Sequence, residues 1–502
     1  MTAYRRNALL LALSAATVAA VLPAAQSASA APRTELTWRN CEVKGGPAGQ
    51  ECADLSVPLD YSEPDGRQLT LAVSRIKSTR PEARRGTLMV IPGGPGSSGV
   101  QRLTQKGARL AKEMDGAYDL VAFDPRGVGG SSRANCELDA GDRWMVTLRS
   151  WPDADGGIEE NVARSRRIAE ACRRNGGPIL DSLTTANQAR DLDRLREALG
   201  EEKISAWGTS YGTYVAAVYA QKFPRHTDRW VLDSSADPNP KRVAQGWMRD
   251  MARGADDRFP DFAAWAVHPD RANEGLRLAD RAQDVRPLVL DLAARLDRTP
   301  VPSTTPGVAV DGKVLLQALQ NALYSDSAFS SMARLVKAAQ DPAAVQDPER
   351  RPVLPPALTQ AMSDEDAAIT VGVICNDVRW TGSVPSYRRA VAAARDTHPL
   401  TGGMPANITP CSFWKAPTEK PVRLTADGPS NILMIQSLKD PATPYTSGLK
   451  MREALGARAR LVTVEQGGHG LYLGNGNACG DATVTRYLLT GERPEKDAYC
   501  AN

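Results

Sequence analysis

Short, continuous runs of apolar residues recur along the chain, with helical patterns between them. Apolar residues on both faces are typical of parallel strands that are covered on both sides. One helical pattern covers 186–199, with Thr184 or Thr185 as its cap and Gly200 as its end. Strands that alternate with helices predict an α/β fold with a mostly parallel sheet. The predicted strands are 87–91, 120–123, 204–207, 230–232, 432–436 and 461–464.

This alternation breaks between residues 238 and 420. That stretch holds many helix-like, Ala- and Arg-rich segments, several Pro-rich loops and few strand patterns. Strand-like runs return only near the C-terminus. We therefore expect a sheet domain in two parts, 31–237 and 421–502, interrupted by a mainly helical cap over 238–420.

The first 30 residues have the features of a signal peptide. Arg5 and Arg6 precede an apolar run from Ala8 to Ala25, and Ala28-Ser-Ala30 is a small-residue cleavage site. A membrane anchor is the alternative, but the run is short and Ala-rich. The arginine pair suggests twin-arginine export as an alternative route, although the residues after it fit that signal poorly. No later stretch is long enough to span a membrane, so we expect a secreted protein without membrane attachment after signal removal.

Composition narrows the class of protein. The chain has 502 residues, 42% of them hydrophobic and 24% charged, as in ordinary globular proteins. Its net charge of +4 comes from 62 basic and 58 acidic residues and gives no electrostatic reason to expect nucleic-acid binding. Only four histidines are present, which argues against a multi-histidine metal site. We therefore expect no metal site. Separately, we expect the protein to be a monomer.

Eight cysteines fit disulfides in an exported protein. No CxxC motif is present, so zinc and thioredoxin-like chemistry are disfavoured. Eight cysteines allow 105 pairings, and the simplest choice joins neighbours in sequence. The expected pairs are Cys41 with Cys52, Cys136 with Cys172, Cys375 with Cys411, and Cys479 with Cys500.

A nucleophile motif follows the strand predicted at 204–207. Gly208-Thr-Ser210-Tyr-Gly212 stands between that strand and a helical run at 214–221. This is the strand–turn–helix setting of the G-x-S-x-G nucleophile elbow, in which a tight turn exposes the serine hydroxyl above the sheet. The five-residue pattern also occurs by chance in Gly/Ser loops, but its setting favours Ser210 as a nucleophile.

A serine hydroxyl needs a general base, and His469 is the best-placed histidine. It lies in a Gly-rich loop just after the strand predicted at 461–464. The other three lie past the elbow helix or before prolines in the helical region: His226, His268 and His398.

Asp440 follows the strand predicted at 432–436 and is the expected partner of that histidine. The alternative is that it only forms an Asp-Pro turn. The order Ser210, Asp440, His469 is the order of α/β-hydrolases, which favours a catalytic triad. Thr443 lies close enough in sequence to hydrogen-bond the Asp440 carboxylate.

An oxyanion hole is also predicted. Pro92-Gly-Gly94-Pro-Gly96 follows the strand at 87–91, and Tyr211 follows the nucleophile. The backbone N–H groups of Gly94 and Tyr211 are the expected donors. A phosphate-binding loop is the alternative, but the loop lacks the Gly-Lys-Ser/Thr ending and its prolines remove donors.

Five motifs together resemble the secreted tripeptidyl aminopeptidases of actinobacteria, in the proline-iminopeptidase-like branch of the α/β-hydrolases. The resemblance runs from about Leu36 to Cys500. It implies an exopeptidase that removes short peptides from free N-termini, often after Pro or Ala, with a helical cap over the site and no cofactor. Pro92 stands where iminopeptidases usually have His, which favours the tripeptidyl subgroup. The motifs are Gly93-Gly-Pro-Gly96, Asp124-Pro-Arg-Gly127, Gly208–Gly212, Asp440–Pro444 and Gly467–Gly470.

An aminopeptidase must also bind the substrate's ammonium group, which requires a carboxylate at a fixed distance from Ser210. Asp377 is the leading candidate because a bridge between Cys375 and Cys411 would hold it under the cap. Asp233 and Asp237 are the others.

The expected function is a secreted serine exopeptidase that acts through an acyl-enzyme. An esterase or amidase acting on a small natural product would use the same triad and is the main alternative. A binding protein without activity is disfavoured because all three triad candidates are present.

Overall fold

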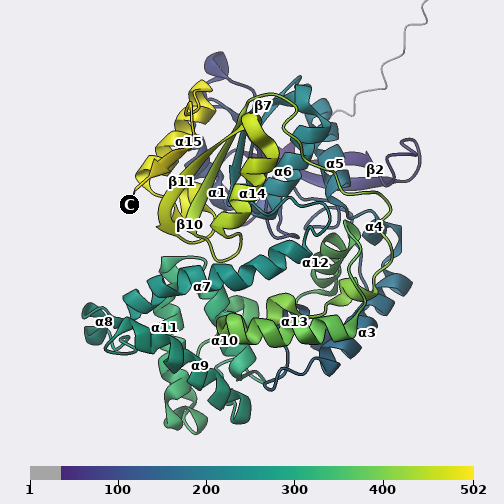
Figure 1. Cartoon of the computed structure of the whole chain (residues 1–502). Helices are drawn as coiled ribbons and strands as arrows, with labels where there is room; N and C mark the ends of the chain where they lie inside the picture. Colours follow the sequence, from purple (N-terminus) through teal and green to yellow (C-terminus); the bar gives the residue numbers. More distant parts are fainter. Residues whose placement is uncertain (1–35, 502) are drawn as a thin grey trace, which may run out of the picture. The chain divides into compact units, whose positions relative to one another are not determined.

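The computed structural model describes residues 36–501. The predicted signal peptide, residues 1–30, lies outside this range. Within it, ten strands form one sheet in the order β1-β2-β3-β5-β4-β6-β7-β10-β11-β12 (Figure 1). The strands are β1 (Arg39–Asn40), β2 (Gln50–Pro58), β3 (Gln68–Ile76), β4 (Thr87–Ile91), β5 (Asp119–Phe123), β6 (Ile204–Thr209), β7 (Thr227–Asp233), β10 (Ile432–Lys439), β11 (Ala459–Gly467) and β12 (Ala498–Cys500).

Seven strands, from β5 to β12 in sheet order, run parallel, as the continuous apolar runs predicted. All six predicted strands are present. The hairpin β2–β3 was not predicted, and it joins the sheet antiparallel to β5. Its sequence alternates instead: Leu55 and Val57 are buried, whereas Ser56 between them is exposed. Such alternation is typical of an antiparallel strand with one face in water.

Helices cover both faces of the sheet. α1 and α15 share one hydrophobic cluster with side chains such as Val90 and Val231. α5, α6 and α14 share another with the opposite face, including Met89 and Leu232. Thr184, one of the two predicted caps, caps α5 by accepting from the Asn187 N–H. The bounds are α1 (Gly99–Glu113), α5 (Thr185–Ala198), α6 (Tyr211–Lys222), α14 (Tyr445–Leu455) and α15 (Ala478–Thr490).

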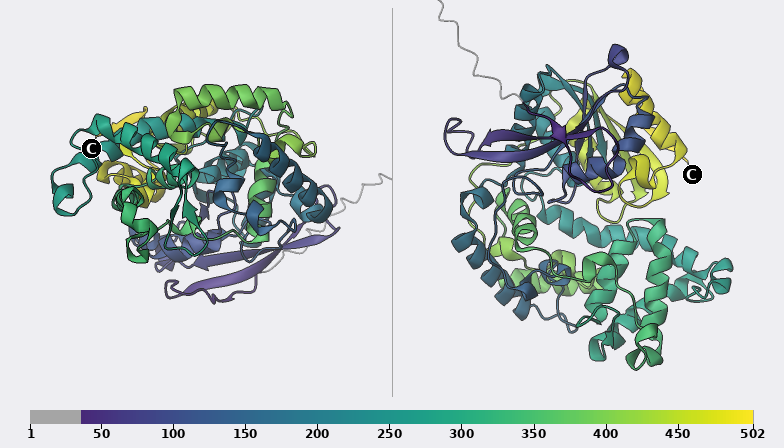
Figure 2. Two further views of the ribbon diagram at one scale, coloured as in Figure 1. Left: turned by 90° about the horizontal axis from the view of Figure 1, so that it is seen from below. Right: turned by 180° about the vertical axis from the view of Figure 1, so that it is seen from behind.

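The remaining helices form a cap beside the C-terminal ends of the parallel strands (Figures 1 and 2). Those between β7 and β10 are α7 (Gln245–Val267), α8 (Asp270–Asn273), α9 (Ala282–Arg298), α10 (Gly312–Ala322), α11 (Phe329–Gln340), α12 (Asp364–Asn376) and α13 (Val384–Thr397). A small hairpin, β8 (Val301–Pro302) and β9 (Ala309–Val310), lies among them.

A segment between β5 and β6 also belongs with the cap, whereas the sequence pattern predicts it in the sheet domain. It contains α2 (Met145–Leu148), α3 (Glu159–Asn175) and α4 (Gly177–Asp181). Trp151 is buried in the cap's own hydrophobic cluster and donates to Gln317 Oε1 at 2.9 Å. The boundary at 237 therefore leaves out part of the cap, because the chain enters it twice.

The four disulfides join the predicted neighbours: Cys41–Cys52, Cys136–Cys172, Cys375–Cys411 and Cys479–Cys500. Across residues 36–501, none of the helices combines the length and the apolar character needed to cross a membrane. Sheet core and cap belong to one compact unit.

Candidate active site

Ser210 lies on a sharp turn between β6 and α6. Its backbone adopts φ 60° and ψ −127°, in the region that favours glycine, which is the strain expected of a nucleophile elbow. A Cβ at Gly208 would lie 2.6 Å from the Gly212 carbonyl oxygen, and one at Gly212 would lie 2.5 Å from the Ile91 carbonyl oxygen. Both glycines are therefore needed for the close approach of strand, turn and neighbouring loop.

His469 and Asp440 form a hydrogen-bonded pair. His469 Nδ1 lies 2.9 Å from Asp440 Oδ2 and 3.0 Å from Oδ1. Asp440 is 0% exposed, and its Oδ1 accepts from the N–H groups of Ala442 and Thr443 at 2.8 Å each. Burial acts to lower the pKa of His469, but the charge and hydrogen bond of Asp440 outweigh it, so this pKa is raised. The carboxylate thus favours the imidazolium form.

The hydroxyl of Thr443 supports this pair. Its Oγ1 lies 3.0 Å from Asp440 Oδ2, 3.0 Å from the Ser234 carbonyl oxygen and 3.4 Å from His469 Nδ1. A hydroxyl has one proton, so it donates to only one of the two oxygen acceptors at a time. Thr443 therefore links the carboxylate to the turn after β7.

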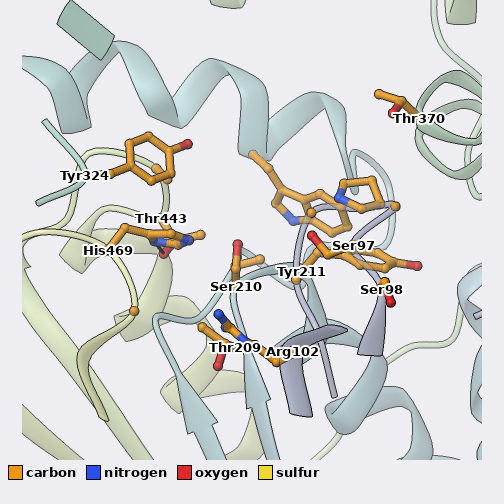
Figure 3. Close-up of a pocket in the computed structure, with 18 of the residues that line it drawn as sticks. Ser97, Ser98, Arg102, Thr209, Ser210, Tyr211, Tyr324, Thr370, Thr443 and His469 are labelled. Atoms are coloured by element: carbon orange, nitrogen blue, oxygen red, sulfur yellow. Dashed lines mark hydrogen bonds between the residues drawn. The ribbon is translucent and has the colours of Figure 1, made fainter. Parts of the chain in front are cut away.

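Ser210 and His469 line the same cavity, and the His469 ring points toward the serine (Figure 3). No hydrogen bond joins the two side chains in the described structure. Catalytic hydrogen bonds are often long before substrate binds and shorten in the complex, so this arrangement is compatible with proton transfer.

Two backbone N–H groups are free beside the nucleophile. Within residues 36–501, neither the Gly94 amide nor the Tyr211 amide donates a hydrogen bond. Gly93 approaches so closely that a Cβ there would lie 2.8 Å from Ser210 Cβ. Asp124 fixes the end of this loop by accepting from the Ser98 hydroxyl at 2.6 Å. Both amides are thus available for an oxyanion.

The cavity has a volume of about 1120 Å³ and lies between sheet core and cap. This exceeds the roughly 300–1,000 Å³ typical of sites for drug-sized ligands and leaves room for a short peptide. The cap contributes apolar side chains, among them Met145, Trp247, Met251, Met362 and Ile374. Apart from the nucleophile elbow and the histidine loop, most of this wall comes from segments without a recognisable motif.

The structure does not support Asp377 as the amine-binding residue. Asp377 is 8% exposed and does not line the catalytic cavity. It accepts from the Thr185 N–H at 2.9 Å and from the Thr185 hydroxyl at 2.5 Å. Burial raises its pKa to about 6. The predicted bridge from Cys375 to Cys411 forms two residues away, but the Asp377 side chain contacts Thr185 of helix α5 and not the cavity.

Asp237 and Asp233 also have other partners. Asp237 is buried, pairs with Arg242 and Lys450 at 2.8 Å each, and does not line the catalytic cavity. Asp233 lines the cavity but is fully buried, which raises its pKa. It accepts from the N–H groups of Leu471 and Tyr472 and so holds the loop after His469.

Charged residues that the sequence analysis missed also line the cavity. They comprise four cations and one partly exposed acid: Arg102, Lys106, Arg133, Arg149 and Asp366. Arg102 and Lys106 lie four residues apart on α1, a helical spacing that the sequence does display. Tyr324 from the cap packs edge-on against His469, with ring centroids 5.2 Å apart, and no sequence signal indicated it. In the described part, no group of three or more His, Cys, Asp or Glu side chains is arranged to hold a metal ion.

Known proteins are similar in sequence to this chain. Residues 398–500 match the family model described as TAP-like protein. The chain is 32% identical to the tripeptidyl aminopeptidase of Streptomyces lividans, over 95% of this chain and 89% of that protein. It is 30% identical to serine protease Hip1 of Mycobacterium tuberculosis, over 93% of this chain and 91% of that protein. It is also 30% identical to carboxylesterase B of the same organism, over 93% and 90%.

The first of these relatives covers nearly the whole chain, cap included. The sheet topology and the strained serine turn agree with an α/β-hydrolase. The chain therefore belongs to the tripeptidyl aminopeptidase family, serine peptidases with the α/β-hydrolase fold.

Proposed function

We propose that this protein is a secreted exopeptidase that releases short peptides, chiefly tripeptides, from free N-termini, with Pro or Ala near the cut. The observation that carries the proposal is the pairing of Asp440 with His469 beside the strained Ser210, within a cavity that the cap encloses. Relatives named tripeptidyl aminopeptidase support the substrate class.

The proposed reaction is acyl transfer. His469 takes the proton of Ser210 as the serine oxygen attacks the scissile carbonyl. The N–H groups of Gly94 and Tyr211 hold the oxyanion. The imidazolium, stabilised by Asp440, then protonates the leaving amine, and water repeats these steps on the acyl-enzyme.

Asp366 is the proposed anchor for the substrate ammonium group. Of the two acids that line the cavity, Asp233 is fully buried, whereas the Asp366 side chain is 52% exposed. Asp366 pairs with Arg133 at 2.6 Å, so an incoming ammonium would share this carboxylate. Thr370, one turn further on α12, lies across Ser210 from His469 (Figure 3). This end of the cavity is therefore the acyl side.

The test uses chromogenic amides of Ala-Pro-Ala and Ala-Pro, each with a free and an acetylated N-terminus, beside a simple ester. We expect cleavage of the free-amine tripeptidyl amide, its loss on acetylation, and a fall of about tenfold in kcat/KM for Asp366→Asn. Asp377→Asn, just past the C-terminal end of the same helix, is the matched control and should keep the free-amine preference. Equal cleavage of blocked amides would contradict an exopeptidase.

An esterase is the second candidate, because a relative 30% identical over 93% of this chain is named carboxylesterase B. The same panel separates the two functions. Ester cleavage without amide cleavage would favour the esterase and leave the assignment of Ser210, Asp440 and His469 unchanged.

Export is part of the proposal. Four disulfides and no free cysteine within the described residues fit an oxidising compartment. Mass spectrometry of the protein recovered from culture medium should give a mature N-terminus near Ala31.

A further inference from the structure

Two cations on helix α1 line the catalytic cavity beside the loop that follows His469. Arg102 and Lys106 lie four residues apart, so they share one face of the helix. Lys106 Nζ donates to the Leu473 carbonyl oxygen at 2.7 Å, and the Arg102 guanidinium lies 5.9 Å from the centre of the Trp207 ring. Asn475, from the same loop, lines this wall too. We call Arg102, Lys106 and Asn475 the basic wall.

Neither cation has a carboxylate partner within salt-bridge distance among residues 36–501. The charge of Asp233 acts on Arg102, but the Asp233 carboxylate already has four donors. Oδ1 accepts from the Leu471 N–H and the Ser234 hydroxyl, and Oδ2 accepts from the Tyr472 N–H and the Trp207 indole. Arg102 therefore keeps donors available for a ligand in the cavity.

The basic wall carries positive charge that its surroundings compensate poorly. Burial lowers the pKa of Arg102, and the charge of Asp233 offsets this only in part. Burial also lowers the pKa of Lys106, and repulsion from Arg102 and Arg109 lowers it further. The attraction of an anion to both cations would offset this repulsion and replace lost hydration.

The direction of the substrate decides which of its parts meets the basic wall. His469 protonates the leaving amine in the proposed reaction, so the chain after the scissile bond passes the loop 470–475. Thr370 lies across Ser210 from His469, at the acyl end (Figure 3), and Asp366 lies one turn before it on α12. The end for the substrate's ammonium group therefore carries Asp366 with its partner Arg133, and the end for the leaving group carries Arg102 and Lys106.

We propose that Arg102 and Lys106 bind a carboxylate on the leaving part of the substrate, so the enzyme favours peptides with an acid just after the cut. This inference rests on the proposed exopeptidase function. The carboxylate has two possible sources: an Asp or Glu side chain, or the C-terminal carboxylate of a short peptide.

The test measures kcat/KM for release of Ala-Pro-Ala from Ala-Pro-Ala-Xaa-Ala-amide, with Asp, Asn or Lys as Xaa. A second pair, Ala-Pro-Ala-Ala with a free or an amidated C-terminus, tests the terminal carboxylate. We expect the acid to exceed its neutral counterpart about 5- to 10-fold in at least one pair, with Lys slower than Asn. The preference should shrink in 0.5 M NaCl because salt screens exposed charges.

Variants connect the preference to the basic wall. Arg102→Gln and Lys106→Gln should each lower the acid-to-neutral ratio toward one, whereas Arg102→Lys should retain most of it. The ratio within each variant cancels any general change in activity or in folded fraction. Lys112→Gln removes an exposed cation from the same helix outside the cavity and should keep the wild-type ratio.

The possible results distinguish failure of the carboxylate site from failure of the proposed exopeptidase function. Release of Ala-Pro-Ala at equal rates from all peptides would overturn the basic wall as a carboxylate site and leave the exopeptidase intact. A preference unchanged in Arg102→Gln and Lys106→Gln would overturn it as well. No release from any free-amine peptide, with ester cleavage retained, would overturn the proposed function itself.

Discussion

The strand-end loops of the sheet and the helical cap build the same cavity in different ways. The loops hold the reacting groups at short, fixed distances, as in the contacts of His469 with Asp440. The cap supplies most of the remaining wall, as in Trp247 and Met251. Reactive geometry thus comes from tight turns at the strand ends, whereas the space for substrate comes from packed helices of the cap.

The cap nevertheless contacts the two turns that carry Asp440 and His469. Helix α7 of the cap passes the Asp440 turn so closely that a Cβ at Gly254 would lie 2.8 Å from the Asp440 carbonyl oxygen. Tyr324 of the cap accepts a backbone hydrogen bond from the His469 N–H at 2.9 Å. The cap therefore helps to position Asp440 and His469, in addition to covering the cavity.

Replacing the nucleophile should have the largest effect. Ser210→Ala should lower kcat on every substrate about 10⁵- to 10⁶-fold, because the covalent route is lost. The melting temperature should fall little, since the alanine keeps the same turn. Substantial turnover by purified Ser210→Ala would place the chemistry elsewhere in the cavity.

Asp440→Asn should lower kcat about 10³- to 10⁴-fold through loss of the imidazolium's partner and of the correct tautomer. The pH profile carries a second signature. Asp440 raises the pKa of His469, and a general base acts in its neutral form, so removing the charge should shift the acid limb of kcat/KM to lower pH. An acid limb that stays in place would mean that another group sets it.

Gly254→Ala should lower kcat about 10- to 100-fold, because the new methyl would press on the Asp440 turn. Gly246→Ala is the matched control in the same helix, since its Cβ would meet only the Arg242 side chain, at 3.4 Å or more. Alanine favours helix, so the control should keep activity and stability. Equal activity of the two variants would show that the cap does not position the acid.

Asp377→Asn should have the smallest effect on activity, within about threefold, because Asp377 lies outside the cavity. Its effect is on stability. The pKa of about 6 lies above the carboxyl's usual 3.8, so the folded protein binds this proton more tightly than the unfolded chain. Wild-type stability should therefore fall as pH rises from about 4 through 6.

The asparagine variant does not titrate, so it should gain a few degrees in melting temperature relative to wild type between pH 4.5 and pH 7.5. Melting curves of both proteins at several pH values measure this difference. A difference that is constant with pH would show that Asp377 does not titrate in the folded protein over this range.

The sequence alone predicted the parts of the molecule that are local. Continuous apolar runs predicted the parallel strands, because a strand buried on both faces needs no polar side. The turn around Ser210 was legible since only glycine fits at Gly208 and Gly212. Neighbouring cysteines gave the disulfides because short loops close easily.

Tertiary structure alone decided what depends on distant segments. The cap is built from two separate segments of the chain. One of them, α2 to α4, lies before the nucleophile in sequence. Asp377 lies close to cap residues along the chain, yet folding turns it to Thr185, while Asp366, eleven residues earlier, reaches the cavity. A sequence motif is recognisable where the backbone geometry permits only a few residue types. The position of a carboxylate on a helix has no such signature, because it depends on which face of that helix packs against its neighbours.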